Sequence, residues 1–242
     1  MTESSAQVFS DNWGIYKKIM QCNYMHHAEF SDHTAAIFKE MKQQQLLVLD
    51  IGCGDAIPVL PHLLSYGKIN YTGYDLSGPA LQIAAANLSS LSGNITLKEG
   101  DMLTLLQEER NMFDLIISSF AIHHLQDGEK NKLLENCYTH LKPGGKMIYT
   151  DIFLTQQPNR EFYINEYFDN INSKWTLMSE KEKQPIFDHV RQFDFPSQLE
   201  DTINFCKKSG FIVTVIFQPD PWHTMILLSK NIKGDNNDIP AG

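Results

Sequence analysis

An aspartate and two closely spaced glycines mark a place in this 242-residue chain where a ligand could be held. In VLDIGCGDAIPVLP, an apolar run ends at Asp50 and is followed by Gly52 and Gly54. Glycines here let the backbone approach a ligand closely and adopt dihedral angles that a side chain forbids. A helix that follows such a turn offers unpaired N–H groups and a partial positive charge. The segment predicts a nucleotide site at the end of the first strand of an open α/β sheet.

The class of nucleotide is narrowed by what this segment lacks. The dinucleotide-binding pattern G-x-G-x-x-G needs a third glycine where this chain has Ile57. No Gly-Lys-Ser/Thr sequence follows, which disfavours a P-loop nucleotidase. The pattern D-x-G-x-G at residues 50–54 remains, and Cys53 fits inside it because it is small. An ordinary strand-to-helix turn is the alternative interpretation.

Two further acids stand at the ends of the next two apolar segments. INYTGYDLS contains Asp75, 21 residues after Gly54 (75 − 54 = 21), which is where a carboxylate holds a ribose diol in nucleotide-binding folds. A helix cap is the alternative role for Asp75, but Ser77 is better placed to cap the next helix. NITLKEGDM ends at Asp101, for which a surface turn is the alternative.

A longer apolar run, FDLIISSFAIHHL (113–125), is typical of a central strand buried on both faces. Its change to Ser118 and Ser119 marks the carboxyl edge of the sheet, where a ligand would lie. LKPGGKMIYTDIF (141–153) completes a series of five blocks between residues 46 and 153.

Together these blocks resemble the class I S-adenosylmethionine-dependent methyltransferases, with a small-molecule, type 11/12-like domain. The resemblance implies a doubly wound, seven-stranded, mostly parallel Rossmann-like sheet of order 3-2-1-4-5-7-6, whose last strand is antiparallel. It implies S-adenosyl-L-methionine as cofactor, with Asp50 near its ammonium group, Asp75 on the ribose and Asp101 on the adenine amino group. The residues expected to bind the cofactor are Asp50, Gly52, Cys53, Gly54, Asp75, Leu76, Asp101, Met102, Ser118, Ser119 and Tyr16.

The chain divides into five predicted segments along its length. These are an N-terminal helical extension and lid (1–45), the cofactor-binding core (46–153), a helical substrate-lid insertion after the fifth strand (154–196), a C-terminal helix and β-hairpin that complete the sheet (197–230) and a flexible tail (231–242). The two regions outside the core are rich in aromatic residues and should hold the acceptor.

Candidate acceptor contacts in those two regions are Trp13, Tyr24, Arg160, Tyr163, Tyr167 and Trp175. Core packing or a dimer contact is the alternative role for the aromatic residues. A surface salt bridge is the alternative role for Arg160, which could otherwise pair with a substrate carboxylate.

Methyl transfer is an in-line displacement on a sulfonium, so the protein must mainly align the reactants and exclude water. A general base is needed only where the acceptor must lose a proton. The candidates are His123, His124 and His27, with packing against the sheet edge as the alternative. No histidine or acid has a partner at an obvious metal-ligand spacing, so no metal is expected.

The amino-acid composition limits the kinds of molecule that this chain is expected to bind. The formal charge of −9, from 29 acids and 20 bases, disfavours nucleic acid and anionic membranes. The four cysteines are scattered, the N-terminus is polar and no apolar stretch is long enough to span a membrane, which together predict a cytoplasmic protein. The sequence is compatible with either a monomer or a homodimer as the oligomeric state.

We therefore expect methylation of oxygen, nitrogen, sulfur or activated carbon in a small molecule. The alternatives are a catalytically silent cofactor-binding module that acts through a protein partner, an aminopropyl transferase on the same fold and a tRNA-modifying transferase.

Overall fold

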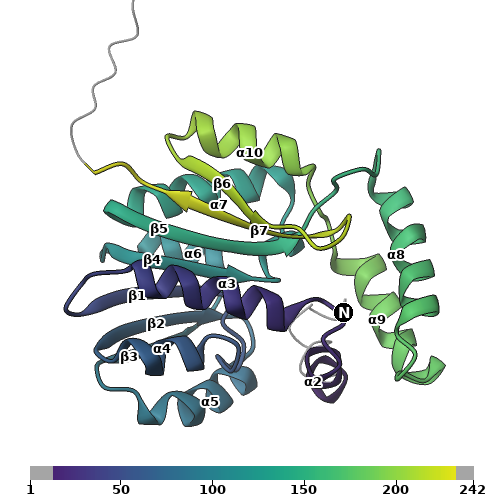
Figure 1. Ribbon diagram of the computed structural model, residues 1–242, viewed down its shortest axis with the longest axis horizontal. Coiled ribbons are helices and arrows are strands. Elements are labelled where there is room, and N and C mark those ends of the chain that lie inside the picture. Colours follow the sequence, from purple (N-terminus) through teal and green to yellow (C-terminus); the bar gives the residue numbers. More distant parts are fainter. Residues whose placement is uncertain (1–12, 233–242) are drawn as a thin grey trace, which may run out of the picture.

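A single seven-stranded sheet forms the centre of the molecule (Figure 1), in a computed structural model that describes residues 13–232. Its order is β3-β2-β1-β4-β5-β7-β6, with β7 antiparallel to both of its neighbours and the other pairs parallel. The predicted topology is confirmed. The strands are β1 (Leu46–Ile51), β2 (Ile69–Asp75), β3 (Ile95–Glu99), β4 (Phe113–Ser119), β5 (Leu141–Ile152), β6 (Ile212–Phe217) and β7 (His223–Ser229).

Helices cover both faces of the sheet. Successive side chains on a strand point to opposite faces, so a central strand that is apolar throughout supplies two cores. In β4, Leu115 and Ile117 pack toward one face, while Ile116 between them packs toward the other. The first face is covered by α3 (His27–Glu40), α4 (Leu60–Tyr66) and α5 (Gly78–Asn87); the second is covered by α6 (Met102–Glu108), α7 (Asp127–His140) and α10 (Leu199–Lys208).

A third core joins the N-terminal helix of the described chain to the segment between β5 and α10. Helix α2 (Trp13–Gln21) meets α8 (Arg160–Lys174) and α9 (Glu180–Phe193), the two helices between β5 and α10 (Figure 1). The ring of Tyr24 stacks on Trp175 with centroids 4.8 Å apart. Lys18 forms a 2.7 Å ion pair with Glu182. The N-terminal segment and the insertion therefore form one layer beside the sheet.

Several local expectations can be compared with the structure. Ser77 caps α5, because its hydroxyl accepts a hydrogen bond from the Ala80 N–H. The helix after the glycine turn begins only at Leu60, since residues 53–59 form a series of turns. The strand in 113–125 ends at Ser119, and a short 3-10 turn, η2 (Ile122–His124), follows it. A second 3-10 turn, η1 (Leu88–Ser90), follows α5. Most of the predicted tail lies outside the described residues.

No helix between residues 13 and 232 is both long and apolar enough to cross a membrane.

Candidate active site

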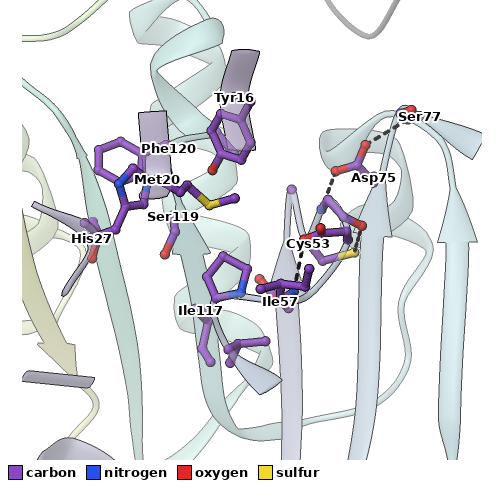
Figure 2. A pocket seen from close by; sticks show the side chains of 18 of the residues that line it. Tyr16, Met20, His27, Cys53, Ile57, Asp75, Ser77, Ile117, Ser119 and Phe120 are labelled. Atoms are coloured by element: carbon purple, nitrogen blue, oxygen red, sulfur yellow. Dashed lines mark hydrogen bonds between the residues drawn. The ribbon is translucent and has the colours of Figure 1, made fainter. Parts of the chain in front are cut away.

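A cavity of about 680 Å³ opens at the carboxyl ends of β1, β2 and β4, under helices α2 and α3 (Figure 2). Ligand pockets commonly measure about 300–1,000 Å³ and lie at this edge of open α/β sheets. Figure 2 shows Tyr16, Met20 and His27 gathered near Phe120 and Ser119, with Cys53 and Asp75 across the opening. The cavity therefore lies between the predicted cofactor loop and the N-terminal helices.

The glycine loop is held in one conformation by β2. Gly52 and Gly54 both have a positive φ, +71° and +53°, which side chains rarely tolerate. A Cβ on Gly52 would lie 2.3 Å from the Cβ of Ala121, so no larger residue fits there. The Gly52 and Cys53 N–H groups donate to the Tyr74 carbonyl at 2.8 and 3.0 Å. These contacts explain the two glycines that follow Asp50 in the sequence: the loop has a positive φ at both positions and no room for a Cβ at Gly52.

Asp75 connects the loop to the cavity wall. One carboxylate oxygen accepts from the Gly54 N–H and the other from the Ser77 N–H, both at 2.8 Å. Burial raises the pKa of Asp75, while these backbone hydrogen bonds lower it, and the net shift is upward. Because Asp75 also lines the cavity, it can both position the loop and accept hydrogen bonds from a ligand.

Asp50 is a buried carboxylate that faces the same cavity. It accepts a 2.8 Å hydrogen bond from the Tyr71 hydroxyl. Burial raises the pKa of Asp50 to about 7; the Tyr71 hydrogen bond opposes this shift and the charge of Asp75 adds to it. A cationic group in the cavity would stabilise the ionised form of Asp50.

A third acid, Asp55, also lies at this site. It directly follows Gly54, but no role was predicted for it from the sequence. It is 1% exposed and lines the cavity. Its Oδ1 accepts from the Ile57 N–H, whereas its buried Oδ2 has no hydrogen-bond partner among the described residues. Burial raises the pKa of Asp55. The unsatisfied oxygen is a ready acceptor for a polar ligand.

Phe120 is a second residue that the sequence did not identify. Its φ of +53° is an outlier for a bulky side chain, and such outliers cluster at ligand sites. Its ring lies 5.2 Å from that of His27, centroid to centroid, and lines the cavity. No local pattern in FAIHH indicates this backbone conformation.

The three predicted catalytic histidines have different environments. His27 lines the cavity, neither ring nitrogen has a hydrogen-bond partner among the described residues, and burial lowers its pKa to about 4. His124 also lines the cavity; burial and the charge of His123 lower its pKa to about 3. Burial lowers the pKa of His123 as well, but Asp151 and Asp194 outweigh this effect and raise it to about 10. Its two ring nitrogens face these carboxylates, and His123 does not line the main cavity.

Most of the predicted cofactor residues line this cavity, but two do not. Asp101 caps α6 by accepting from the Thr104 N–H at 2.9 Å. The Ser118 hydroxyl is buried and donates to the Ile51 carbonyl at 3.0 Å. The predicted cofactor residues that line the cavity are Asp50, Gly52, Cys53, Gly54, Asp75, Leu76, Met102, Ser119 and Tyr16.

The predicted aromatic acceptor residues separate into three groups. Trp13 lines the main cavity, and Tyr167 and Trp175 line a smaller cavity of about 110 Å³ beside it. Tyr24 and Tyr163 lie behind these walls: Tyr24 accepts from the Leu177 N–H, and buried Tyr163 donates to Asp194. Trp13 apart, these residues belong to the third core.

Arg160 lines neither cavity, so the expected role in binding a substrate carboxylate needs correction. Its guanidinium donates to the carbonyls of Val190, Arg191 and Asp194 and lies over the Phe195 ring. The Val190 carbonyl also accepts from the Asp194 N–H, so Arg160 adds a second hydrogen bond there and supplies one to each of the Arg191 and Asp194 carbonyls at the end of α9. Arg160 therefore fixes α8 to the end of α9.

Comparison with known proteins supports the resemblance found in the sequence. Residues 48–145 match the family model described as a methyltransferase domain. This match, the relatives and the solved structures support a class I S-adenosylmethionine-dependent methyltransferase. The matched region begins in β1 and ends in the Pro-Gly-Gly segment of β5, so it contains the glycine loop and the acids that follow it.

Two curated relatives of this chain have named activities. It is 35% identical over 135 residues to a phosphoethanolamine N-methyltransferase from Plasmodium falciparum, covering 56% of this chain and 49% of the relative. It is 30% identical over 105 residues to a ubiquinone biosynthesis O-methyltransferase from Coxiella burnetii, covering 43% of each. The chain thus spans about half the length of these relatives or less.

Solved structures support the fold. A magnesium protoporphyrin IX methyltransferase from Synechocystis, with SAH bound, aligns with a TM-score of 0.62 at 14% identity. The alignment covers 93% of this chain and 98% of that one. The likeness extends across the sheet and both regions outside the matched domain.

Proposed function

We propose that this chain binds S-adenosylmethionine in the 680 Å³ cavity and methylates a small molecule on oxygen, nitrogen, sulfur or activated carbon. The observation that carries the proposal is the position of Asp50 and Asp75 at the ends of adjacent parallel strands, on one cavity, beside the glycine loop. Asp101 contributes to the same region only through its neighbours Gly100 and Met102, which line the cavity.

The residues present fit this cofactor. The buried Asp50 carboxylate, whose pKa is raised to about 7, favours a cation such as the ammonium of a methionine moiety. Asp75 faces the cavity as a hydrogen-bond acceptor suited to a ribose diol. The loop glycines keep the backbone open to the ligand, because a Cβ on Gly54 would approach only the Trp13 ring, at 3.8 Å.

When bound, S-adenosylmethionine supplies an electrophilic methyl group on a sulfonium, which becomes a neutral thioether on transfer. The chain's own task is to align the acceptor and exclude water. Trp13, Tyr16 and Met20 of α2 cover the cavity. His27 is neutral near pH 7, so its ring can accept a hydrogen bond from an acceptor O–H or N–H and orient it.

The smaller cavity supports an acceptor with an apolar part. It shares Tyr16, Phe120, His124 and His189 with the main cavity, so the two adjoin. Much of its remaining wall is aliphatic and aromatic, contributed by Ile15, Ile19, Met25, Ile152, Tyr167, Trp175, Pro185, Ile186 and Val190. The named activities of the relatives and the net charge of −9 further favour a small molecule over nucleic acid. All four cysteines are unpaired, which supports a reducing, cytoplasmic location.

The direct test is calorimetric titration of the purified chain with S-adenosylhomocysteine, followed by methyl transfer from labelled cofactor to a panel of small phenols, amines and thiols. We expect saturable one-to-one binding and label in at least one acceptor. Absence of binding by a folded protein would refute the proposal. Binding without transfer to any acceptor would favour the silent module over the enzyme.

The role of His27 is tested with His27→Asn once an acceptor is found. The shorter side chain should lower kcat and leave S-adenosylhomocysteine affinity unchanged, because Figure 2 shows His27 beside Phe120 and away from Cys53 and Asp75. Equal loss of both quantities would place His27 in cofactor binding instead.

A further inference from the structure

A cluster of three histidines surrounds a buried aspartate where the end of α9 meets η2. Asp194, the C-cap of α9, is 2% exposed. Its Oδ1 lies 3.5 Å from His123 Nε2, 3.7 Å from His124 Nδ1 and 3.6 Å from His189 Nε2. This oxygen accepts no hydrogen bond among the described residues, whereas Oδ2 accepts one from Tyr163. A buried carboxylate oxygen is therefore directed at three ring nitrogens without a short bond to any of them.

The distances suit a metal ion better than a hydrogen-bonded network. Zinc is held tetrahedrally by nitrogen and oxygen ligands at about 2.1 Å, so its ligand atoms lie about 3.4 Å from one another. Ligand atoms of His123, His124 and Asp194 all lie within 4.8 Å of each other. His124 Nδ1 also lies 3.1 Å from the Phe193 carbonyl; binding an ion through Nδ1 would move the single proton of the neutral ring to Nε2 and replace this hydrogen bond.

A second carboxylate orients His123 in the way that metal-bound histidines are usually oriented. His123 Nδ1 is 2.5 Å from Asp151 Oδ1, and the His123 N–H donates to Asp151 Oδ2 at 3.0 Å. A ring N–H donated to a carboxylate fixes the tautomer and directs the other nitrogen at the metal. Here the other nitrogen, Nε2, faces Asp194.

The charges also favour a divalent cation. Asp151 and Asp194 are both buried, and both carboxylates face the single ring of His123. Lys130 is buried nearby, but its ammonium group binds Ser197, Asp127 and the Phe195 carbonyl. A divalent ion held by neutral imidazoles would balance both carboxylates.

We propose that His123, His124 and Asp194 bind a divalent transition-metal ion of the zinc class, with His189 beside them and Asp151 as the outer support. The ion would lie at the wall that the two cavities share, since His124 and His189 line both. Sequence spacing could not reveal this site, because its ligands come from η2 and from the end of α9.

A second cluster in the described chain provides a matched comparison. His26, Asp220 and His223 also place three metal-binding side chains together. There, however, both imidazoles lie within hydrogen-bond distance of Asp220 Oδ2, at 3.1 and 2.7 Å, and two backbone N–H groups donate to Oδ1. Asp220 is satisfied without an ion, so we expect no metal there.

The test is a titration of the chelator-treated full chain with Co²⁺, followed by visible absorption and competition with Zn²⁺. We expect one ion per chain and the intense bands of low-symmetry cobalt. Asp194→Asn keeps the shape of the side chain and should weaken affinity by more than about 100-fold, while Asp151→Asn should weaken it by about 10–100-fold. Asp220→Asn should change nothing.

Circular dichroism must show that each variant is folded; if Asp194→Asn is not, His124→Gln replaces it with the same expected loss. Absence of a saturable one-to-one spectrum in the wild type would overturn the proposal. Loss of binding in Asp220→Asn but not in Asp194→Asn or His124→Gln would place the ion in the other cluster and overturn it equally. Because the measurement needs no cofactor, its outcome is independent of that of the methyl-transfer assay.

Discussion

The proposed cofactor side and the proposed acceptor side of the site are built in different ways. The glycine loop and Asp75 come from one continuous stretch, β1 to β2, in which Asp75 itself bonds the loop N–H of Gly54. The acceptor side joins α2 to α8 and α9 through contacts such as the stack of Tyr24 on Trp175. Local chemistry thus specifies the first side, whereas the second exists only once distant segments have packed. Substitutions should therefore affect the two sides separately.

The largest effect on cofactor binding is expected from Gly52→Ala. The new Cβ would lie 2.3 Å from that of Ala121 at a φ of +71°, so the loop must move. Affinity for S-adenosylhomocysteine, measured by calorimetry, should fall by at least about 100-fold, which corresponds to roughly 3 kcal/mol, the upper range for backbone strain.

Gly54→Ala is the matched control for Gly52→Ala. It has a similar φ of +53° but no neighbour nearer than 3.8 Å, so only the conformational cost of about 1–2 kcal/mol applies. Its loss of affinity should be smaller. Equal losses in the two variants would mean that positive φ, and not the contact with Ala121, limits the loop.

Asp75→Asn should have the next largest effect. It removes the charge that accepts hydrogen bonds from Gly54 and from the proposed ribose, and a hydrogen bond to a charged group contributes about 1.5–3 kcal/mol. We expect S-adenosylhomocysteine affinity to fall by roughly 10–100-fold.

Asp101→Asn is the control for this substitution, because Asp101 caps α6 outside the cavity and asparagine caps equally well. The affinity of the Asp101→Asn variant for S-adenosylhomocysteine should equal that of the wild type. A large loss there would restore Asp101 as a direct cofactor contact.

Sequence alone predicts the fold and the glycine loop better than it predicts the roles of single side chains. The loop was predictable because glycine chemistry acts locally, and the sheet order followed from the resemblance to a known family. The roles of Asp101 and Arg160 were not predictable, because they depend on backbone groups at the start of α6 and at the end of α9 that bind these side chains. His123 likewise depends on Asp151 and on Asp194, which is 71 residues away (194 − 123 = 71).

Proton release should accompany cofactor binding. The pKa of Asp50 is raised to about 7 in the folded chain, above its usual 3.8, so Asp50 is largely protonated below pH 7. A bound ammonium group favours the carboxylate and displaces that proton, so affinity should fall by up to about tenfold per pH unit below 7 and be flat above it. Without ligand, the same shift lowers stability as pH rises from about 4 to 7.

Calorimetry in buffers of different ionisation enthalpy measures this proton directly. Asp50→Asn should abolish the buffer dependence. If the dependence persists in that variant, another group titrates on binding.

The smallest effect on cofactor binding is expected from Ile186→Trp, which should instead affect the acceptor. Ile186 lines the 110 Å³ cavity but not the main one, so a larger side chain there would fill the proposed acceptor site. S-adenosylhomocysteine affinity should stay at the wild-type value. KM for the acceptor should rise and kcat should change less, because a loss of binding that is common to the ground state and the transition state appears in KM. Ile186→Val, which removes only one methylene group, should leave both quantities close to wild type and so controls for the position itself. If Ile186→Trp weakened the cofactor and the acceptor equally, the two cavities would form a single site, and the independence of the two sides would be lost.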